Sequence, residues 1–158
     1  MGLALASRAA VVTWQEAEDA LIGAFEYLAA LPDRQAGLLS AGSRSAWPQV
    51  LRIMQEDYPD ARPPQVRVGK REMALLEAML LGPRACALAV APGQRSFVGR
   101  VIVMKRWQSP GGFEWSEVWQ REGGRSCGGT SDALRKRYER AVSRVAAAME
   151  AAGLERAA

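Results

Sequence analysis

The stretch that most constrains the fold is residues 114–149, in which two amphipathic segments flank a glycine-rich turn. In the second segment, apolar residues recur every three or four positions and predict one buried helix face: Leu134, Tyr138, Ala141, Val145 and Met149. The basic residues of this segment fall on the opposite side: Lys136, Arg137, Arg140 and Arg144. The pattern predicts a helix-turn-helix whose second helix opens on Thr130 and presents positive charge outward, as a reader of the DNA major groove does.

The distribution of charge along the 158 residues says more than the net charge of +4. Residues 1–77 hold 8 Lys/Arg and 10 Asp/Glu, whereas residues 78–113 hold 5 basic residues and no acidic one. Residues 114–144 then hold 7 basic and 5 acidic residues. The positive excess therefore lies in the second half, with the predicted helix-turn-helix. This asymmetry is expected when one end of a protein meets phosphate.

Composition favours an all-α fold, because Ala, Leu and Arg are abundant and β-branched residues are few. A hydrophobic fraction of 49% is enough for a packed core. The two cysteines, Cys86 and Cys127, have no CxxC spacing and fit reduced thiols in a cytosolic protein. Residues 1–10 do not resemble a secretory signal, and no apolar run reaches the roughly 18 residues of a membrane span. We therefore expect a soluble, cytoplasmic protein without a membrane partner.

An N-terminal helical region is predicted over residues 1–60. Thr13 and Glu16 have the spacing of a capping box, and the helix that they open ends before Pro32. A second helix is predicted to start at Trp47-Pro48, because proline suits the first turn of a helix. An N-terminal region of this kind is expected to pack on the second half of the chain or on another copy of itself.

Prolines mark a linker over residues 61–68, after which residues 69–158 form a helical helix-turn-helix region. A helix over about 69–81 is stopped by a glycine-proline pair. The small apolar segment 84–92 is either a helix or a short buried stretch, and periodicity does not decide between them. Residues 94–107 contain enough valine and isoleucine for a strand, but their basic residues do not alternate cleanly, so we favour a helix.

A trihelical core is predicted from three helices: about 94–107, 114–122 and 130–152. Large aromatic side chains dominate small cores, so three tryptophans are expected to pack between these helices: Trp107, Trp115 and Trp119. The plain alternative for the basic run 135–144 is a solvated helix face. Its one-sided placement, the charge asymmetry and the preceding turn favour DNA binding over that alternative. The residues that we assign to DNA binding are Arg125, Thr130, Lys136, Arg137, Arg140 and Arg144.

Three segments, QRSFVGRVIVMKRW, GFEWSEVWQREGG and TSDALRKRYERAVSRV, resemble the C-terminal helix-turn-helix of sigma-type factors. Most of residues 13–150, including TWQEAEDAL, Leu31-Pro32 and Trp47-Pro48, is similar to an uncharacterised family of small proteins of alphaproteobacterial phages and prophages. The resemblance implies DNA binding and no known reaction. The chain departs from the pattern in its turn, residues 123–129, which is longer than usual, and at Glu114, where a Ser or Thr cap is common.

An enzyme is not expected. The chain has no histidine, and it lacks a P-loop, a dinucleotide-binding glycine motif and a nucleophile elbow. We predict neither a cofactor nor a metal, and the acids Glu56, Asp57 and Asp60 are interpreted as the surface of a helix end. The glycines of residues 123–129 fit a turn at least as well as a phosphate cradle.

The expected function is DNA binding, as a regulator of phage or prophage transcription. One alternative is the DNA-recognition (small) subunit of a phage packaging terminase, which also combines a helix-turn-helix with an oligomerising helical region. The alternative from another class is a protein–protein adaptor whose basic helix contacts an acidic partner such as RNA polymerase. Double-stranded DNA, a second copy of the chain and RNA polymerase are therefore the partners considered.

Overall fold

The computed structural model describes residues 11–31, 67–106 and 112–154, and the all-α expectation is confirmed there. These residues form five α-helices and no strand: α1 (Trp14–Ala30), α4 (Lys70–Leu76), α5 (Pro92–Arg106), α6 (Trp115–Arg121) and α7 (Ser131–Ala151). Several predicted features lie outside the described residues: the helix from Trp47-Pro48, Trp107, the acids Glu56, Asp57 and Asp60, and most of the linker 61–68.

Helix α1 begins with the predicted capping box. The Thr13 hydroxyl accepts a hydrogen bond from the Glu16 amide at 3.2 Å, and the Glu16 carboxylate accepts one from the Thr13 amide at 2.9 Å. The helix ends at Ala30, ahead of the proline that was expected to stop it. Its inner face buries Leu21, Phe25 and Leu28.

The predicted helix 69–81 is present, but its last turn has a wider form. After α4, residues Glu77–Leu81 form a π-helical turn, η1, closed by a 2.8 Å hydrogen bond from the Gly82 amide to the Glu77 carbonyl. A Cβ at Gly82 would lie 2.9 Å from that carbonyl oxygen, so the closure requires glycine. The segment left undecided, 84–92, contains a short 3-10 helix, η2 (Cys86–Ala89).

Helix α5 begins two residues earlier than predicted. The sequence pattern placed its start at Gln94, whereas the structure starts the helix at Pro92. Proline tolerates the first helical turn because the missing amide would have no partner there. Gln94 and the amino end of α5 lie beside α7, where the Gln94 side chain accepts a hydrogen bond from Arg137.

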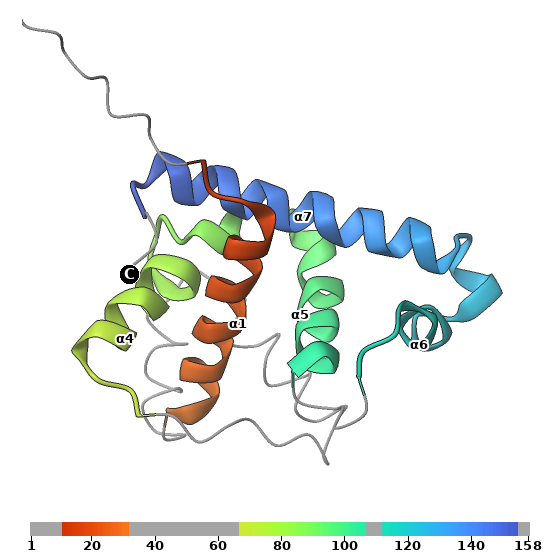
Figure 1. Ribbon diagram of the computed structural model, residues 1–158, viewed down its shortest axis with the longest axis horizontal. Helices are drawn as coiled ribbons and strands as arrows, with labels where there is room; N and C mark the ends of the chain where they lie inside the picture. The colour runs from red at the N-terminus through yellow and green to blue at the C-terminus, as the bar shows by residue number, and fades with distance from the viewer. Residues whose placement is uncertain (1–10, 32–66, 107–111, 155–158) are drawn as a thin grey trace, which may run out of the picture.

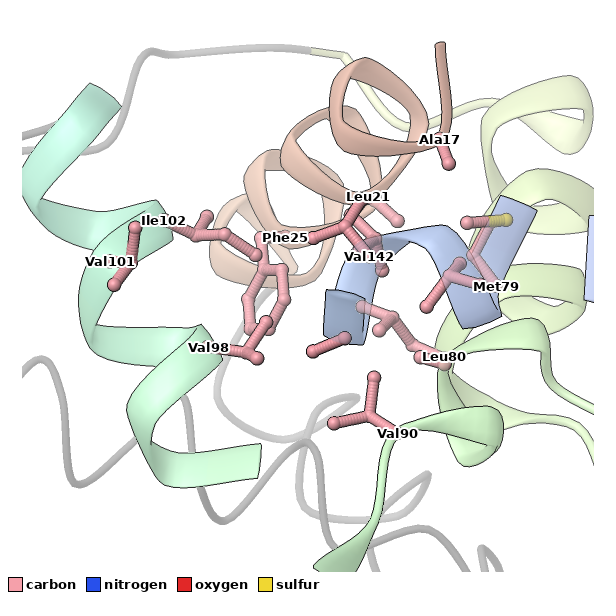
Figure 2. Close-up of a cluster of buried hydrophobic side chains, with 14 of the residues drawn as sticks. Ala17, Leu21, Phe25, Met79, Leu80, Val90, Val98, Val101, Ile102 and Val142 are labelled. Carbon is pink, nitrogen blue, oxygen red and sulfur yellow. The ribbon is translucent and has the colours of Figure 1, made fainter. Parts of the chain in front are cut away.

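One apolar core joins the helices. Helix α7 runs across one side of the molecule, α1 and α5 cross beneath it, α4 lies beside α1, and α6 lies under the N-terminal end of α7 (Figure 1). The predicted stripe of α7 is confirmed, since its members are all buried: Leu134, Tyr138, Ala141, Val145 and Met149. Side chains from α1, η1, α5 and α7 meet in the core, so α1 packs on the second half of the chain (Figure 2).

Lys105 of α5 forms a polar connection between helices at the edge of this core. Its Nζ lies 2.6 Å from Glu18 Oε1 of α1, and the Tyr138 hydroxyl of α7 donates to the same oxygen at 2.8 Å. The ammonium also lies 5.2 Å from the Phe113 ring centre and 5.9 Å from that of Trp115. Burial, and secondarily the Glu18 carboxylate, raises the pKa of Tyr138 well above its usual value.

Two arginines of α5 connect this helix to neighbouring parts of the chain. Arg95 donates from Nε to the Val90 carbonyl at 3.1 Å and from Nη2 to the Leu88 carbonyl at 3.4 Å. Arg100 binds Glu122 at the end of α6 with two hydrogen bonds, of 2.5 and 3.0 Å.

In the described part of the chain, no single helix has the length and apolar character of a membrane span. The segments Lys70–Ala89 and Pro92–Lys105 have that length and apolar character only when taken together, and the two are bent by 112° at the break between them.

Candidate nucleic-acid interface

The turn between α6 and α7 is fixed by glycines and by one tryptophan. Gly123, Gly124 and Gly128 have φ angles of 103°, 55° and 71°, which side-chain-bearing residues rarely adopt. Between them lies a 3-10 turn, η3 (Gly124–Cys127). The Trp119 indole packs against Gly124 and donates from Nε1 to the Gly129 carbonyl at 2.7 Å. The turn is longer than that of most helix-turn-helix proteins, but these glycines and the Trp119 contacts give it a defined backbone conformation.

Two of the predicted DNA-binding residues lie at this turn. Thr130 is the N-cap of α7, as predicted, and its hydroxyl accepts a hydrogen bond from the Ala133 amide at 3.2 Å. Arg125 lies in η3 and is exposed. At the start of α6, Glu114 occupies the cap position without capping the helix, and its carboxylate accepts from the Ser116 hydroxyl instead. The first helix of the pair is thus less firmly capped than the second.

Lys136 is exposed but its charge has a partner. Its Nζ lies 3.0 Å from one oxygen of Asp132, and Arg135 binds the other oxygen at 2.7 Å. Hydrogen bonds from Lys136 first, and then Arg135, lower the pKa of the Asp132 carboxyl. Ion pairs as exposed as these contribute little to stability and exchange readily with solvent.

The other three predicted arginines gather on one side of α7. Arg137, Arg140 and Arg144 line a groove between α7 and the start of α5, which we call the arginine groove; its remaining lining is Ala91, Gln94 and Ala141. The groove has a volume of about 60 Å³. A water molecule needs roughly 10–15 Å³ of such space, so the groove has room for several waters or for a small oxyanion.

Arg137 differs from the expectation that it projects outward. It is half-buried, because its Nε donates to Gln94 Oε1 at 3.2 Å and its guanidinium carbon lies 4.6 Å from the centre of the Phe97 ring. Arg140 and Arg144 are exposed, as expected. The reason for the difference is tertiary: α5 starts early and crosses α7 at this position, so it covers one edge of the basic face.

The arginine groove contains unbalanced positive charge. Within the ranges that the structure describes, no carboxylate lies within 4.0 Å of the guanidinium nitrogens of Arg137, Arg140 or Arg144. The groove also adjoins the amino end of α5, where the helix dipole adds partial positive charge. These features favour an anion.

The sequence indicated the arginines of this site but not Gln94, Ala91 or the amino end of α5. The one available signal was the Pro-Gly pair at 92–93, because proline is common in the first turn of a helix. Comparison of the chain with protein-family models, with curated proteins and with solved structures finds no match.

Proposed function

We propose that this protein binds double-stranded DNA through the basic side of α7, in a helix-turn-helix arrangement formed by α6, η3 and α7. The observation that carries the proposal is the set of three arginines on one side of α7 that have no carboxylate partner among the described residues. A surface with unbalanced guanidinium groups suits a polyanion, since phosphate contacts supply most of the affinity of DNA-binding proteins.

The spacing of the arginines fits a DNA backbone. Arg137 and Arg144 are seven residues apart, which corresponds to about 10 Å along a helix. Such a length faces only a short stretch of one DNA backbone, so the three guanidinium groups, which line the same groove, can converge on one phosphate. Arg125 and Lys136 lie towards the N-terminal end of α7, where helix-turn-helix proteins contact base edges.

Within DNA binding, we propose regulation of phage or prophage transcription, because the chain resembles both small proteins of phages and prophages and the helix-turn-helix of sigma-type factors. The DNA-recognition subunit of a packaging terminase would use the same surface. An adaptor that contacts an acidic protein would also use it, so the experiment below includes that outcome.

The test is a titration of a labelled duplex at two salt concentrations with the protein and three variants. Arg140→Ala and Arg144→Ala should each weaken binding and reduce the slope of log affinity against log salt by about one unit. Arg71→Ala removes an exposed arginine from α4 and should change neither quantity. Thermal melts of each variant show whether the fold is retained.

A salt slope that is the same in all four proteins would contradict the proposal. Absence of duplex binding, together with salt-dependent binding to an acidic protein such as RNA polymerase, would replace DNA binding with the adaptor function.

A further inference from the structure

The arginine groove has the features of a specific anion site and not only of a charged surface. Arg137, Arg140 and Arg144 follow one another at i, i+3 and i+7. Like charges three or four residues apart on a helix repel one another and destabilise it. On the same helix, Arg135 and Lys136 share the carboxylate of Asp132, which balances their charge. The three arginines of the groove have no such acid among the described residues, so a bound anion would relieve their repulsion.

Arg137 is held in place before any ligand arrives. Its Nε is occupied by Gln94, and its guanidinium lies on the Phe97 ring, so the side chain has a fixed direction. This arrangement leaves its two terminal nitrogens without a partner among the described residues. A guanidinium fixed in this way matches the tetrahedral oxygens of phosphate with two parallel donors and loses little conformational freedom on binding.

We propose that the arginine groove is a pocket for one phosphoryl group, which Arg137, Arg140 and Arg144 bind beside the amino end of α5. The inference rests on the proposed function in one respect: a phosphate of the DNA backbone is taken as the natural occupant. Gln94 acts as a positioning residue, because its side-chain oxygen orients Arg137. The small side chains Ala91 and Ala141 leave the space that the phosphoryl group fills.

The discriminating variant is Gln94→Glu, which keeps the shape of the side chain and places a carboxylate beside Arg137. This carboxylate pairs with Arg137 and competes with phosphate for the pocket. The variant should therefore melt at the same temperature as the wild type or higher. Gln15→Glu is the matched control, because it makes the same charge change at an exposed position of α1.

Two measurements are made on each full-length protein. The first is the melting temperature in inorganic phosphate and in chloride of equal ionic strength. Phosphate also stabilises folded proteins non-specifically, so the quantity of interest is the difference between wild type and Gln94→Glu. We expect a phosphate-dependent rise in wild type and Gln15→Glu that Gln94→Glu lacks. The second measurement is the salt slope of duplex binding, which should fall by about one to two units in Gln94→Glu alone.

The outcomes separate this inference from the proposed function. If Gln94→Glu loses the phosphate effect but binds duplex like wild type, the pocket holds free phosphate and the inference that it holds the DNA backbone is overturned. If Arg140→Ala and Arg144→Ala weaken duplex binding while Gln94→Glu matches wild type in both measurements, DNA binding by α7 stands and the pocket is overturned. Loss of both signals in Gln94→Glu, with its melting temperature retained, supports the pocket with a backbone phosphate as its occupant.

Discussion

The basic residues of α5 and those of α7 have opposite roles. Arg100 and Lys105 of α5 bind the carboxylates of Glu122 and Glu18, so their charge connects α5 to α6 and α1. Arg140 and Arg144 of α7 have no carboxylate partner in the described ranges. The segment with the largest positive excess in the sequence, residues 78–113, thus uses much of its charge to hold the fold together.

The comparison teaches that the number of charges in a segment does not measure its capacity to bind an anion. A cation paired with a partly buried acid contributes to stability and is not available to a ligand. An unpaired cation on a packed helix contributes little to stability and remains available. Four substitutions sharpen or break this division, in order of the expected effect on the free energy of unfolding.

Glu18→Gln should have the largest effect. The substitution leaves Lys105, whose side chain is only 22% exposed, without its carboxylate partner. The amide oxygen of the new glutamine can still accept the hydrogen bond from the Tyr138 hydroxyl. We expect a loss of about 1.5–3 kcal/mol in the free energy of unfolding, measured with urea. Asp19→Asn removes the same charge from the next, exposed residue and should change stability by less than about 0.5 kcal/mol. Equal effects of the two would show that Lys105 does not depend on its partner.

Alkaline unfolding should depend on Tyr138. Its pKa in the folded state is raised by burial and by Glu18, so the unfolded chain releases the proton at a lower pH than the folded chain. Stability is therefore complete below about pH 10 and falls above it, by about 1.4 kcal/mol for each pH unit up to the folded pKa. Tyr138→Phe should abolish this fall, whereas Tyr27→Phe in α1 should retain it. Urea titrations between pH 8 and about 11.5 give the free energy of unfolding at each pH. The slope of this free energy against pH is compared among the three proteins, so a difference in their stability at neutral pH does not affect the comparison.

Glu122→Gln should have a smaller effect, of about 1 kcal/mol. The substitution removes one oxygen from the pair of hydrogen bonds with Arg100, whose side chain is 30% exposed and partly screened by solvent. Glu117→Gln, in the i,i+4 pair with Arg121 on the same helix, should change stability by only about 0.3 kcal/mol. Similar losses in the free energy of unfolding for the two variants would show that the Arg100–Glu122 pair contributes no more to stability than an exposed ion pair.

Arg140→Ala should have the smallest effect on stability, within about 0.5 kcal/mol, because the side chain is exposed and has no hydrogen-bond or ion-pair partner among the described residues. A slight gain is expected, since the substitution removes repulsion from Arg144. A loss above about 1.5 kcal/mol would show that Arg140 holds the fold together as Lys105 does.

Local patterns in the sequence predicted much of the fold. The capping box of α1, the cap at Thr130 and the buried stripe from Leu134 to Met149 depend on residues within one helix, so spacing alone indicates them. The π-helical turn η1 and the early start of α5 were not predicted. Both depend on how a glycine or proline is accommodated by the surrounding packing, which periodicity does not encode.

The site was predicted in part for the same reason. The positions of Arg140 and Arg144 on the outer side of α7 follow from helical geometry. Whether a cation is paired depends on neighbours far away in the sequence: Gln94 is 43 residues from Arg137, and Glu18 is 87 residues from Lys105. Such pairs cannot be found from the pattern of a single segment, so spacing along the chain does not separate the cations of α5 from those of α7.

The packed inner face of α7 has a thermodynamic consequence for any ligand on its outer face. Seven residues from Leu134 to Met149 are buried, so the helix is already formed and rigid before binding. Segments that fold on binding bury large apolar areas and show a strongly negative change in heat capacity. An anion on α7 orders little and buries little apolar surface, so its binding should show a heat capacity change close to zero and a favourable entropy from released counterions. Titration calorimetry at several temperatures would measure this heat capacity change, and a value near zero would indicate that α7 binds as a preformed, rigid surface.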